Sequence, residues 1–531
     1  MSFSSQPLPT RRHELINRLA ATPQADLVVI GGGATGLGVA LDAALRGLSV
    51  VLLEAHDFAK GTSSRATKLV HGGVRYLAQG NIKLVRQALH ERRTLLRNAP
   101  HLVGRLPFVM PAYSCWETPF YGAGLKMYDM LAGPGDIGRT RFLSADAVRQ
   151  QLPGVRTDGL KGGVSYWDGQ FDDARLALAL ARSAAAQGAL LLNYCAVTQL
   201  VHRDGRVAGV VCEDKETGNH YTVHAKAVVN ATGVWVDAIR DLDEQGAADQ
   251  RKGMVEPSRG VHVVVDQSFS PGGHALLVPR TRDGRVLFAV PWLGKLILGT
   301  TDTATPDMPD EPMAQSAEVD FILSEAAKYL ATPPTRRDVR SVWAGLRPLV
   351  RPSRHETGGT GRYSREHFID VSRSGLLTVT GGKWTTYRVM AEDVLSQCVQ
   401  HKLLPDLPAS KTATTSLVGS WADAGIERDL SGVPAGLASY GSEAPWLATL
   451  GVIQQDIVPG LSPAMVRFAV RYEYARTVED VLARRSRLLF LDAAAAEEAA
   501  GPVGALIEQE LQRNPETDAF IALARQYQAV P

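Results

Sequence analysis

The chain has 531 residues, 45% of them hydrophobic and 21% charged, with a formal net charge of +2. At roughly 150 residues per domain this length predicts two or three domains of a folded globular protein. The near-neutral charge gives no reason to expect a nucleic-acid partner. The four cysteines form no C-x-x-C pair or ligand cluster, which indicates a reducing compartment rather than a structural metal.

The N-terminal segment 1–24 is predicted to be a helical extension, with a short amphipathic helix at 13–20. It carries several arginines and no apolar core, which argues against a secretory signal. Elsewhere no apolar stretch reaches the roughly 18 residues of a membrane span. We therefore expect any membrane contact to be peripheral.

A dinucleotide-binding fingerprint follows. Gly31, Gly33 and Gly36 have the G-x-G-x-x-G spacing, and Glu54 lies roughly 20 residues beyond them. The glycines allow a tight turn and a close approach of a pyrophosphate to a helix N-terminus, and the carboxylate can accept hydrogen bonds from ribose hydroxyls. An ordinary glycine-rich turn is the alternative, but the surrounding elements favour the nucleotide site. They are strand 27–30, helix 34–45 and strand 49–53.

The middle of the chain mixes helices with strands of alternating polarity. A Gly/Ser/Thr-rich loop over 61–77 suits phosphate or flavin binding, and Asp283-Gly284 marks a hairpin. Together these elements predict an antiparallel substrate sheet beside the nucleotide unit. The predicted helices are 81–98 and 172–187, and the predicted strands are 196–200, 207–212, 221–224, 227–229, 260–266, 275–278, 285–289 and 295–298.

A second glycine turn lies far along the chain. Strand 376–379 leads into Gly381-Gly382-Lys383 and a helix ending near residue 400. A helix N-terminus beside a lysine suits the carbonyl edge of a flavin, where negative charge develops on reduction. A strand-to-helix turn with a surface lysine would have the same sequence, so this motif alone leaves both readings open.

Four cations lie next to glycine or proline: Arg75, Arg347, Lys383 and Arg388. Guanidinium groups bind phosphate in a bidentate way and lysine adds a point charge. If these side chains converge on one pocket, they predict a phosphorylated or carboxylated substrate. Independent surface cations are the alternative for any one of them.

Two histidines are candidates for a general base toward an alcohol, His71 and His262. A single histidine is more often a satisfied structural residue. The turns 171–175 and 299–302 have two interpretations: they lie close to the substrate, or they only cap neighbouring helices and strands.

Taken together, the motifs resemble those of FAD-dependent glycerol-3-phosphate dehydrogenases, within the D-amino-acid oxidase-like flavoprotein superfamily. The resemblance covers about residues 25–490, and the segments around His71 and Lys383 are its most specific parts. The matching segments are Val29–Gly36, Thr62–Leu77, Asp172–Leu176, Asn230–Val236, Gly299–Asp302, Gly345–Leu349, Gly381–Arg388 and Tyr474–Arg485.

The resemblance implies an α/β fold in three parts. A Rossmann-like FAD-binding domain and an antiparallel-sheet substrate domain share residues 25–409, and a helical C-terminal domain covers 410–531. We expect the FAD-binding segments at about 25–80, 160–240 and 340–409, and the substrate segments at about 81–159 and 241–339.

The resemblance also implies site residues. FAD is expected to bind to Gly31, Gly33, Gly36, Glu54, Ser63, Ser64 and Gly382. Glycerol 3-phosphate is expected to contact Arg75, Tyr76, Arg347, Lys383 and Thr386. We expect His262 to take the hydroxyl proton, with His71 nearby, and Lys383 and Arg75 to stabilise developing negative charge.

The implied reaction is oxidation of glycerol 3-phosphate to dihydroxyacetone phosphate, with electrons passed to a quinone from a cytoplasmic position on the inner face of the cell membrane. Helix 81–98 and the aromatic segment 117–132 are the candidate membrane surfaces; an ordinary surface helix is the alternative for the first, and a buried segment of the substrate domain is the alternative for the second. An oxygen-dependent oxidase, an amino-acid oxidase and a non-catalytic redox sensor remain alternatives. The sequence also leaves a homodimer open.

Overall fold

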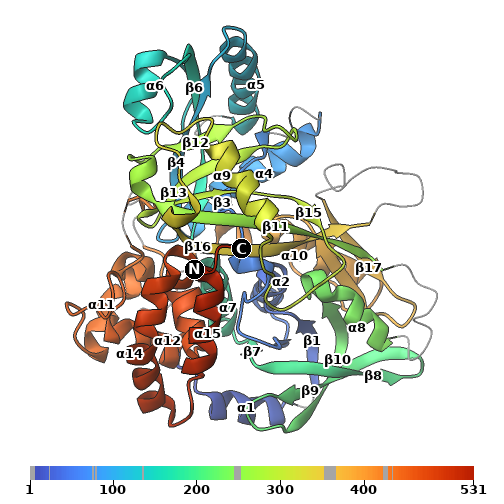
Figure 1. The fold of residues 1–531 in the computed structure, drawn as a ribbon. Coiled ribbons are helices and arrows are strands. Elements are labelled where there is room, and N and C mark those ends of the chain that lie inside the picture. The colour runs from blue at the N-terminus through green and yellow to red at the C-terminus, as the bar shows by residue number, and fades with distance from the viewer. Residues whose placement is uncertain are drawn as a thin grey trace.

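The computed structural model of the protein describes residues 6–22, 24–74, 77, 80–133, 137–243, 253–351, 366–421, 428–432 and 434–531. These residues form two β-sheets with helices against them, and a group of helices near the C-terminus (Figure 1). The predicted α/β fold class is confirmed.

The first sheet contains the predicted nucleotide-binding unit. Strand β1 pairs in parallel with β2 and with β10, and β10 pairs in parallel with β18. The strand order is β17-β18-β10-β1-β2-β7, with β8 and β9 joined to β10 as an antiparallel extension. The bounds are β1 Gln24–Ile30, β2 Val50–Leu53, β7 Leu190–Leu192, β8 Cys195–Arg203, β9 Arg206–Asp214, β10 His220–Asn230, β17 His367–Val371 and β18 Leu377–Gly381.

Helix α2 (Ala34–Leu45) begins directly after the glycine turn, with the predicted bounds. All but one of its residues are buried, because it packs between α7 (Asp173–Ala186) and α10 (Tyr387–Gln400). Asp172 caps α7 by accepting a hydrogen bond from the Arg175 N–H. The turn 171–175 is thus a helix cap. Helices α1 (Arg12–Ala20) and α8 (Val236–Asp243) flank the same sheet.

The second sheet is the predicted substrate sheet. Among the described residues its pairings are antiparallel, except for the parallel pair β12–β4. The strand order is β15-β11-β14-β13-β12-β4-β6-β3, with β16 on β11 and β5 on β6. The bounds are β3 Leu69–Val70, β4 Val103–Ala112, β5 Arg141–Ser144, β6 Gly162–Phe171, β11 Val255–Asp266, β12 Ala275–Val278, β13 Leu287–Trp292, β14 Lys295–Gly299, β15 Thr303–Ala304 and β16 Val339–Val350.

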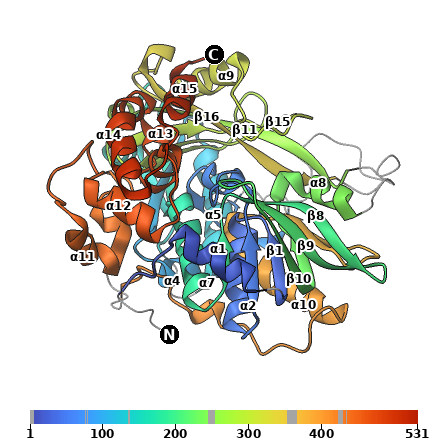
Figure 2. The ribbon, with the colours of Figure 1, turned by 90° about the horizontal axis from the view of Figure 1, so that it is seen from below.

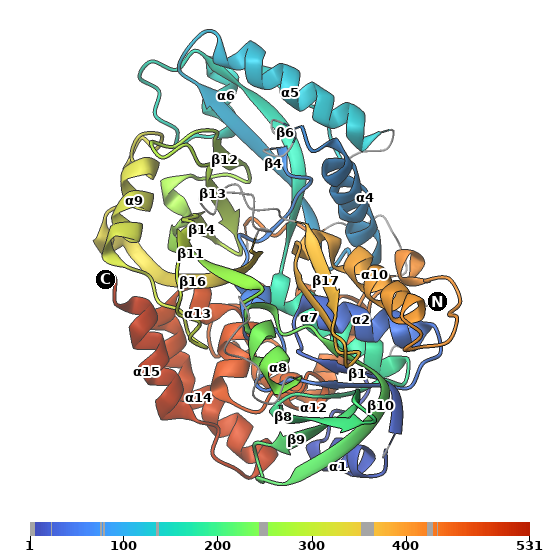
Figure 3. The same ribbon diagram turned by 90° about the vertical axis from the view of Figure 1, so that its right-hand side faces the viewer.

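Helices cover the substrate sheet and its far end. Helix α4 (Ile82–Asn98) matches the predicted helix, and α5 (Glu117–Ala132) lies with α6 (Ala145–Gln151) at the end of the molecule opposite α1 (Figures 1 and 3). Helix α9 (Ser316–Ala326) packs on β11, β13 and β14.

The C-terminal residues form a helical group, as predicted. Asp492 caps α14 by accepting from the Ala495 N–H, and α14 continues to Leu511. The N-terminal segment reaches this group where the Thr10 N–H donates to the Arg471 carbonyl, 2.8 Å away (Figure 2). The bounds are α11 Ala444–Leu447, α12 Pro463–Tyr472, a π-helical turn Asp480–Arg485, α13 Leu488–Leu491, α14 Ala493–Leu511 and α15 Thr517–Gln528.

Two predictions about strands were incomplete. Segments 221–224 and 227–229 form one continuous strand, β10, whose N-terminal half pairs with β9 and whose C-terminal half lies in the parallel sheet. The long strands β4, β6 and β16 were not foreseen. Proline and glycine inside them, such as Pro107 and Pro348, weaken the strand pattern that the sequence presents.

Candidate active site

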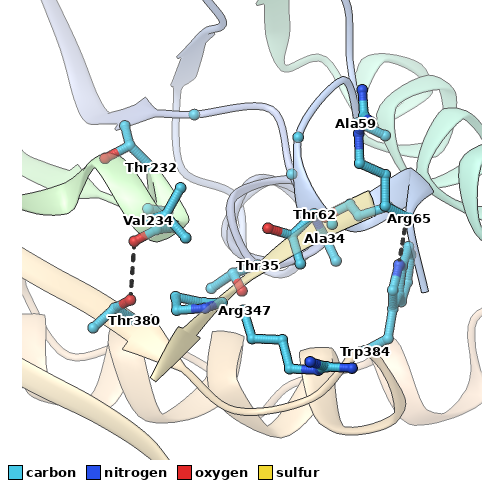
Figure 4. Close-up of a pocket in the computed structure, with 18 of the residues that line it drawn as sticks. Ala34, Thr35, Ala59, Thr62, Arg65, Thr232, Val234, Arg347, Thr380 and Trp384 are labelled. Atoms are coloured by element: carbon cyan, nitrogen blue, oxygen red, sulfur yellow. Dashed lines mark hydrogen bonds between the residues drawn. The ribbon is translucent and has the colours of Figure 1, made fainter. Parts of the chain in front are cut away.

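A cavity of about 510 Å³ is lined by segments far apart in the sequence. One part of its wall comes from the turns after β1 and β2 and from segment 59–71, and another from the turn after β10. Further parts of the wall come from β11, β16 and the turn after β18. Figure 4 shows residues of these segments around it, including Thr35, Thr232, Thr380 and Trp384.

The glycine fingerprint forms one end of this cavity. Gly31 has φ +108°, and a Cβ there would lie 2.7 Å from the Ala231 carbonyl oxygen. A Cβ on Gly36 would lie 2.0 Å from the Gly31 carbonyl oxygen, so helix and strand approach here as only glycine permits. Gly33 lines the cavity at the start of α2. Gly31 and Gly36 therefore have the local geometry of a tight turn and of a close helix–strand contact, and FAD binding by the three glycines stays a prediction.

Glu54 also lines the cavity, but its carboxylate is already engaged with the backbone. It accepts hydrogen bonds from the Gly32 N–H at 2.6 Å and the His56 N–H at 2.8 Å. Burial raises the pKa of Glu54 despite these donors. Each carboxylate oxygen has a second lone pair, so ribose binding by Glu54 stays a prediction.

The two predicted serines have different surroundings. Ser63 lines the cavity, and its Oγ accepts from the Ala34 N–H at 2.9 Å, at the N-terminus of α2 where a pyrophosphate would bind. Ser64 is not among the lining residues; its side chain is buried and its Oγ has no hydrogen-bond partner. Its carbonyl oxygen accepts from Lys68 Nζ and from Arg487 Nη2.

The second glycine turn closes the other end of the cavity. Gly381 and Gly382 have φ angles of +78° and +74°, and a Cβ on Gly382 would lie 2.5 Å from Met390 Sδ. Trp384 Nε1 donates to the Ser63 carbonyl oxygen at 2.8 Å, which joins the segment after the second glycine turn to segment 59–71. Thr386 lies behind the cavity wall, where its hydroxyl donates to the Lys383 carbonyl oxygen.

Arg347 and His262 lie together on adjacent strands. The Arg347 guanidinium lies over Gly260, donates to the Thr301 carbonyl and the Thr300 hydroxyl at 3.1 Å each, and lies 3.5 Å from the Asp302 carboxylate. The turn 299–302 therefore positions Arg347. Both Arg347 and His262 line the cavity.

The environment of His262 favours a neutral imidazole. The ring stacks on Trp343 at 4.1 Å between centroids, and its Nε2 lies 2.9 Å from the Thr67 hydroxyl. Burial, with the positive charges of Arg347 and Lys68, holds the pKa of His262 well below its usual value. Its Nδ1 is buried without a hydrogen-bond partner. A neutral imidazole can accept a proton, as a general base must.

The structure brings together only part of the predicted cation cluster. His71 and Lys383 line the cavity with Arg347 and His262. Arg388 does not join them: it forms a buried bidentate pair with Glu91 at 2.6 and 2.9 Å and also binds Glu392. The predictions for Arg75 and Tyr76 lie outside the described residues.

Several residues at the site were missed from the sequence. Thr67 and Trp343 contact His262, and the fully buried Lys68 lies 4.7 Å from the Trp343 ring centroid. Gly260 and Gly299 leave the space that Arg347 and His262 fill. Thr67 and Lys68 belong to the Gly/Ser/Thr-rich loop 61–77, and the composition of that loop was the sequence feature that could have marked them as site residues. No local sequence feature marked Gly260 and Gly299, because the side chains that they make room for are far away in sequence.

The shape of the cavity fits FAD. The fingerprint end offers glycines and a helix N-terminus to a pyrophosphate, with Glu54 beside the expected ribose. The other end offers two left-handed glycines, Lys383 and the N-terminal part of α10 to a flavin ring. A cofactor spanning both would reach the wall that carries Arg347 and His262.

Comparisons with known proteins agree with this geometry. Residues 26–388 match the family described as FAD dependent oxidoreductase, and residues 412–518 match the C-terminal domain of alpha-glycerophosphate oxidase. The mitochondrial glycerol-3-phosphate dehydrogenase of Homo sapiens is 40% identical, covering 95% of this chain and 72% of its own. That of Saccharomyces cerevisiae is 37% identical, covering 92% of this chain and 87% of its own.

The fold is also similar to solved structures. The glycerol-3-phosphate dehydrogenase of Bacillus halodurans, solved in complex with FAD, is 30% identical with a TM-score of 0.77, covering 98% of both chains. The L-alpha-glycerophosphate oxidase of Mycoplasma pneumoniae, with FAD bound, is 16% identical with a TM-score of 0.56, which shows the shared fold alone. Family, cavity and fingerprint together identify FAD as the cofactor, and the chain belongs to the FAD-dependent glycerol-3-phosphate dehydrogenases.

Proposed function

We propose that this protein oxidises sn-glycerol 3-phosphate to dihydroxyacetone phosphate and passes the electrons to a membrane quinone. The observation that carries the proposal is the pairing of Arg347, a phosphate-binding cation, with His262, a neutral imidazole, on one cavity wall. The names of the relatives, glycerol-3-phosphate dehydrogenases at 37–40% identity, support the same substrate.

Arg347 is the proposed phosphate ligand. Its guanidinium is held by the Thr300 hydroxyl and the Thr301 carbonyl, and two hydrogen bonds fix its plane. A fixed planar donor suits bidentate binding of phosphate oxygens. Lys383 adds a second positive charge on the opposite glycine turn. Arg75 and Tyr76 remain predicted ligands on the strength of the sequence motif.

His262 is the proposed base. It takes the proton of the C2 hydroxyl while the C2 hydrogen leaves with its two electrons as hydride, and the carbonyl of dihydroxyacetone phosphate forms. Bound FAD supplies the two-electron acceptor and can release the electrons singly to a quinone. Lys383 stabilises negative charge that develops during the reaction, and His71, which also lines the cavity, is a further polar contact.

The quinone proposal requires contact with a membrane. None of the helices in the described part of the chain has the length and apolar character needed to cross a bilayer. Helix α5 nevertheless lies at one end of the molecule (Figure 3). It exposes large apolar side chains there, with Phe120 66% and Met130 80% exposed. Lys126, Arg139 and Arg141 lie nearby on the surface.

This combination supports peripheral attachment through α5, with the apolar side chains in the lipid interface and the cations near its phosphates. Helix α4, the other candidate, buries Arg92 against Asp168 and Glu91 against Arg388, so its inward face serves packing. We propose that the protein attaches to the inner face of the cell membrane, because its proposed substrate, glycerol 3-phosphate, is a charged phosphate ester found in the cytoplasm.

The deciding experiment is anaerobic addition of glycerol 3-phosphate to the FAD-loaded protein. We expect loss of flavin absorbance and formation of one dihydroxyacetone phosphate per FAD. A panel of amino acids and unphosphorylated glycerol serves as the control. No loss of absorbance with glycerol 3-phosphate would favour a non-catalytic sensor, and bleaching by an amino acid would favour an amino-acid oxidase.

An oxidase that uses oxygen is the second candidate. It is favoured by the match of residues 412–518 to a domain described from alpha-glycerophosphate oxidase. An oxygen electrode separates the two functions. The dehydrogenase should consume oxygen slowly with substrate alone and reduce an added ubiquinone analogue quickly, whereas an oxidase would consume oxygen and release peroxide without quinone.

A further inference from the structure

Residues 57–68 form a wall of the FAD cavity, which we call the wall segment. It packs directly on the glycine turn: the Ala59 N–H donates to the Gly32 carbonyl at 3.0 Å, and Phe58 fills the space beside Gly32. Ser63 Oγ reaches the N-terminus of α2. The position of the wall segment therefore sets the shape of the site for the FAD phosphates.

The C-terminal helical region contacts the wall segment first at Asp57. This fully buried carboxylate accepts hydrogen bonds from Arg484 and Arg485, both in the π-helical turn, and Arg485 Nη2 lies 3.0 Å from its Oδ1. The two guanidinium groups hold the pKa of Asp57 below its usual value, so the pair stays ionised. π-Helical turns are rare and occur often at functional sites.

Two further contacts lie along the middle of the wall segment. Lys60 Nζ pairs with both carboxylate oxygens of Glu479 at 2.8 Å. Arg65 donates to the Tyr527 hydroxyl at 3.0 Å, and that hydroxyl in turn donates to Glu311 at 2.6 Å. Tyr527 belongs to α15, so the contacts come from two separate parts of the C-terminal region.

The last contact is at Ser64 and is the most buried. Arg487 is fully buried, and its Nη2 donates to the Ser64 carbonyl at 2.7 Å and to Asp173 at 3.1 Å. Lys68 donates to the same carbonyl and the same carboxylate. Arg487 has φ +68°, a conformation that costs free energy in a non-glycine residue and persists only where surrounding contacts fix it.

Lys60 and Arg65, two of the residues held by these contacts, line the cavity, whereas their C-terminal partners do not. No described residue beyond Met390 is among those that line it, so the C-terminal region reaches the wall segment from its outer side. Buried ion pairs of this kind add little stability over apolar packing of the same volume, but they fix relative position. The arrangement is what a positioning role requires.

We propose that the C-terminal helical region is a clamp on the wall segment, and that it sets how tightly FAD is held. Arg487, Glu479 and Tyr527 are positioning residues in this clamp, since each acts on FAD through the wall segment. The inference goes beyond the proposed function, because it concerns retention of the cofactor whatever the substrate and the electron acceptor are.

The test measures FAD binding directly. The variants Arg487→Met, Glu479→Gln and Tyr527→Phe are prepared as full chains, FAD is removed, and the dissociation constant is found by titrating FAD back while following flavin fluorescence. Loss of a hydrogen bond to a charged group predicts a rise in Kd of about tenfold for each variant. Arg487→Lys should recover part of the affinity. Arg471→Gln is the matched control, since it breaks an exposed C-terminal ion pair far from the wall segment.

A second readout separates a clamp from a merely structural contact. FAD binding raises Tm by an amount that depends on its affinity. A clamp variant should therefore show a smaller difference between the Tm of the FAD-bound and FAD-free protein. An equal drop in both Tm values with unchanged Kd would overturn the proposal. If Arg487→Met does not fold, Glu479→Gln and Tyr527→Phe decide, because their side chains lie nearer the surface or lose a single hydroxyl. No substrate is present, so failure here is distinct from failure of the proposed reaction.

Discussion

Gly260 and Gly299 leave the space filled by Arg347 and His262, the proposed phosphate ligand and the proposed base. A Cβ on Gly260 would lie 2.4–2.6 Å from the guanidinium atoms of Arg347, and a Cβ on Gly299 would lie 2.5 Å from the His262 ring. The positions of Arg347 and His262 thus depend on the absence of a side chain on a neighbouring strand. Gly260 has no left-handed φ, so a larger residue there would fit the backbone but displace Arg347.

Gly260→Ala tests this directly. We expect KM for glycerol 3-phosphate to rise on the order of tenfold to a hundredfold, because a displaced phosphate ligand misplaces the substrate. FAD content and Tm should stay near those of the parent. Gly501→Ala, at a helical position with open space around it, is the control and should change neither constant. An unchanged KM in Gly260→Ala would show that Arg347 does not need its present position.

Arg347→Met removes the proposed phosphate ligand. A charged hydrogen bond contributes about 1.5–3 kcal/mol, so KM should rise about tenfold to a hundredfold. The variant has a second signature. The Arg347 charge lowers the pKa of His262, so its loss should raise that pKa and move the acid limb of kcat/KM to higher pH. Arg340→Met on the same strand, an exposed residue paired with Asp266, should show neither effect. A raised KM with an unmoved acid limb would exclude His262 as the base.

At the scale of elements, the sequence predicted what short-range patterns encode. The helix after the fingerprint and strand β12 have the predicted bounds, because a glycine turn and a short apolar run define them locally. Strands β4 and β16 were missed, since partners far away in sequence stabilise them despite their prolines. Which of the predicted cations meet in one cavity also depends on contacts between residues far apart in sequence. Arg388 lies in the same local sequence motif as Lys383, yet it pairs with Glu91 on another helix and does not line the cavity.

Helix α5 is the element through which we propose that the protein contacts a membrane. Its inner side packs through Leu125 and Tyr128, whereas Phe120 and Met130 face outward. We expect the double variant Phe120→Ser/Met130→Ser to bind vesicles of anionic phospholipid on the order of tenfold more weakly than the parent. The reason is that the two large apolar side chains no longer enter the lipid interface. Sedimentation with vesicles measures the binding.

The same double variant should keep its activity with a water-soluble electron acceptor, since α5 lies away from the cavity residues. Val452→Ser is the control, because Val452 is similarly exposed but belongs to the C-terminal region. Unaltered vesicle binding by Phe120→Ser/Met130→Ser would exclude α5 as the membrane contact and leave the exposed face of α4 as the alternative.

At the scale of the whole molecule, the C-terminal helices share a core with the substrate sheet and ion pairs with the nucleotide unit. One cluster of buried apolar side chains extends from Trp292 and Trp343 in the sheet to Phe490 and Tyr527 in the helices. Arg175 of α7 pairs with Glu473, and Arg182 pairs with Glu443. The C-terminal helices are therefore joined to both other parts of the molecule by buried contacts.

His101 reports on this assembly. It is buried between the substrate sheet and the C-terminal region, and burial with the charges of Arg175, Arg428 and Arg182 lowers its pKa to about 3. In the unfolded chain the His101 imidazole binds a proton with its usual pKa of about 6.5, whereas in the folded protein it stays neutral until the pH approaches 3. The stability contributed by neutral His101 is thus fully present above pH 6.5 and is lost as the pH falls toward 3.

Between pH 7.5 and 5.5 this loss amounts to about 1.4 kcal/mol of unfolding free energy for one histidine. Other groups titrate in the same range, so the measurement is the difference between the parent and His101→Gln, obtained by denaturant unfolding of the FAD-saturated protein at both pH values. The variant should lose about 1.4 kcal/mol less than the parent over this range. His13→Gln, at an exposed position, should behave as the parent. Equal losses in the parent and in His101→Gln would mean that His101 becomes protonated without unfolding, and that the junction between the sheet and the C-terminal helices admits water.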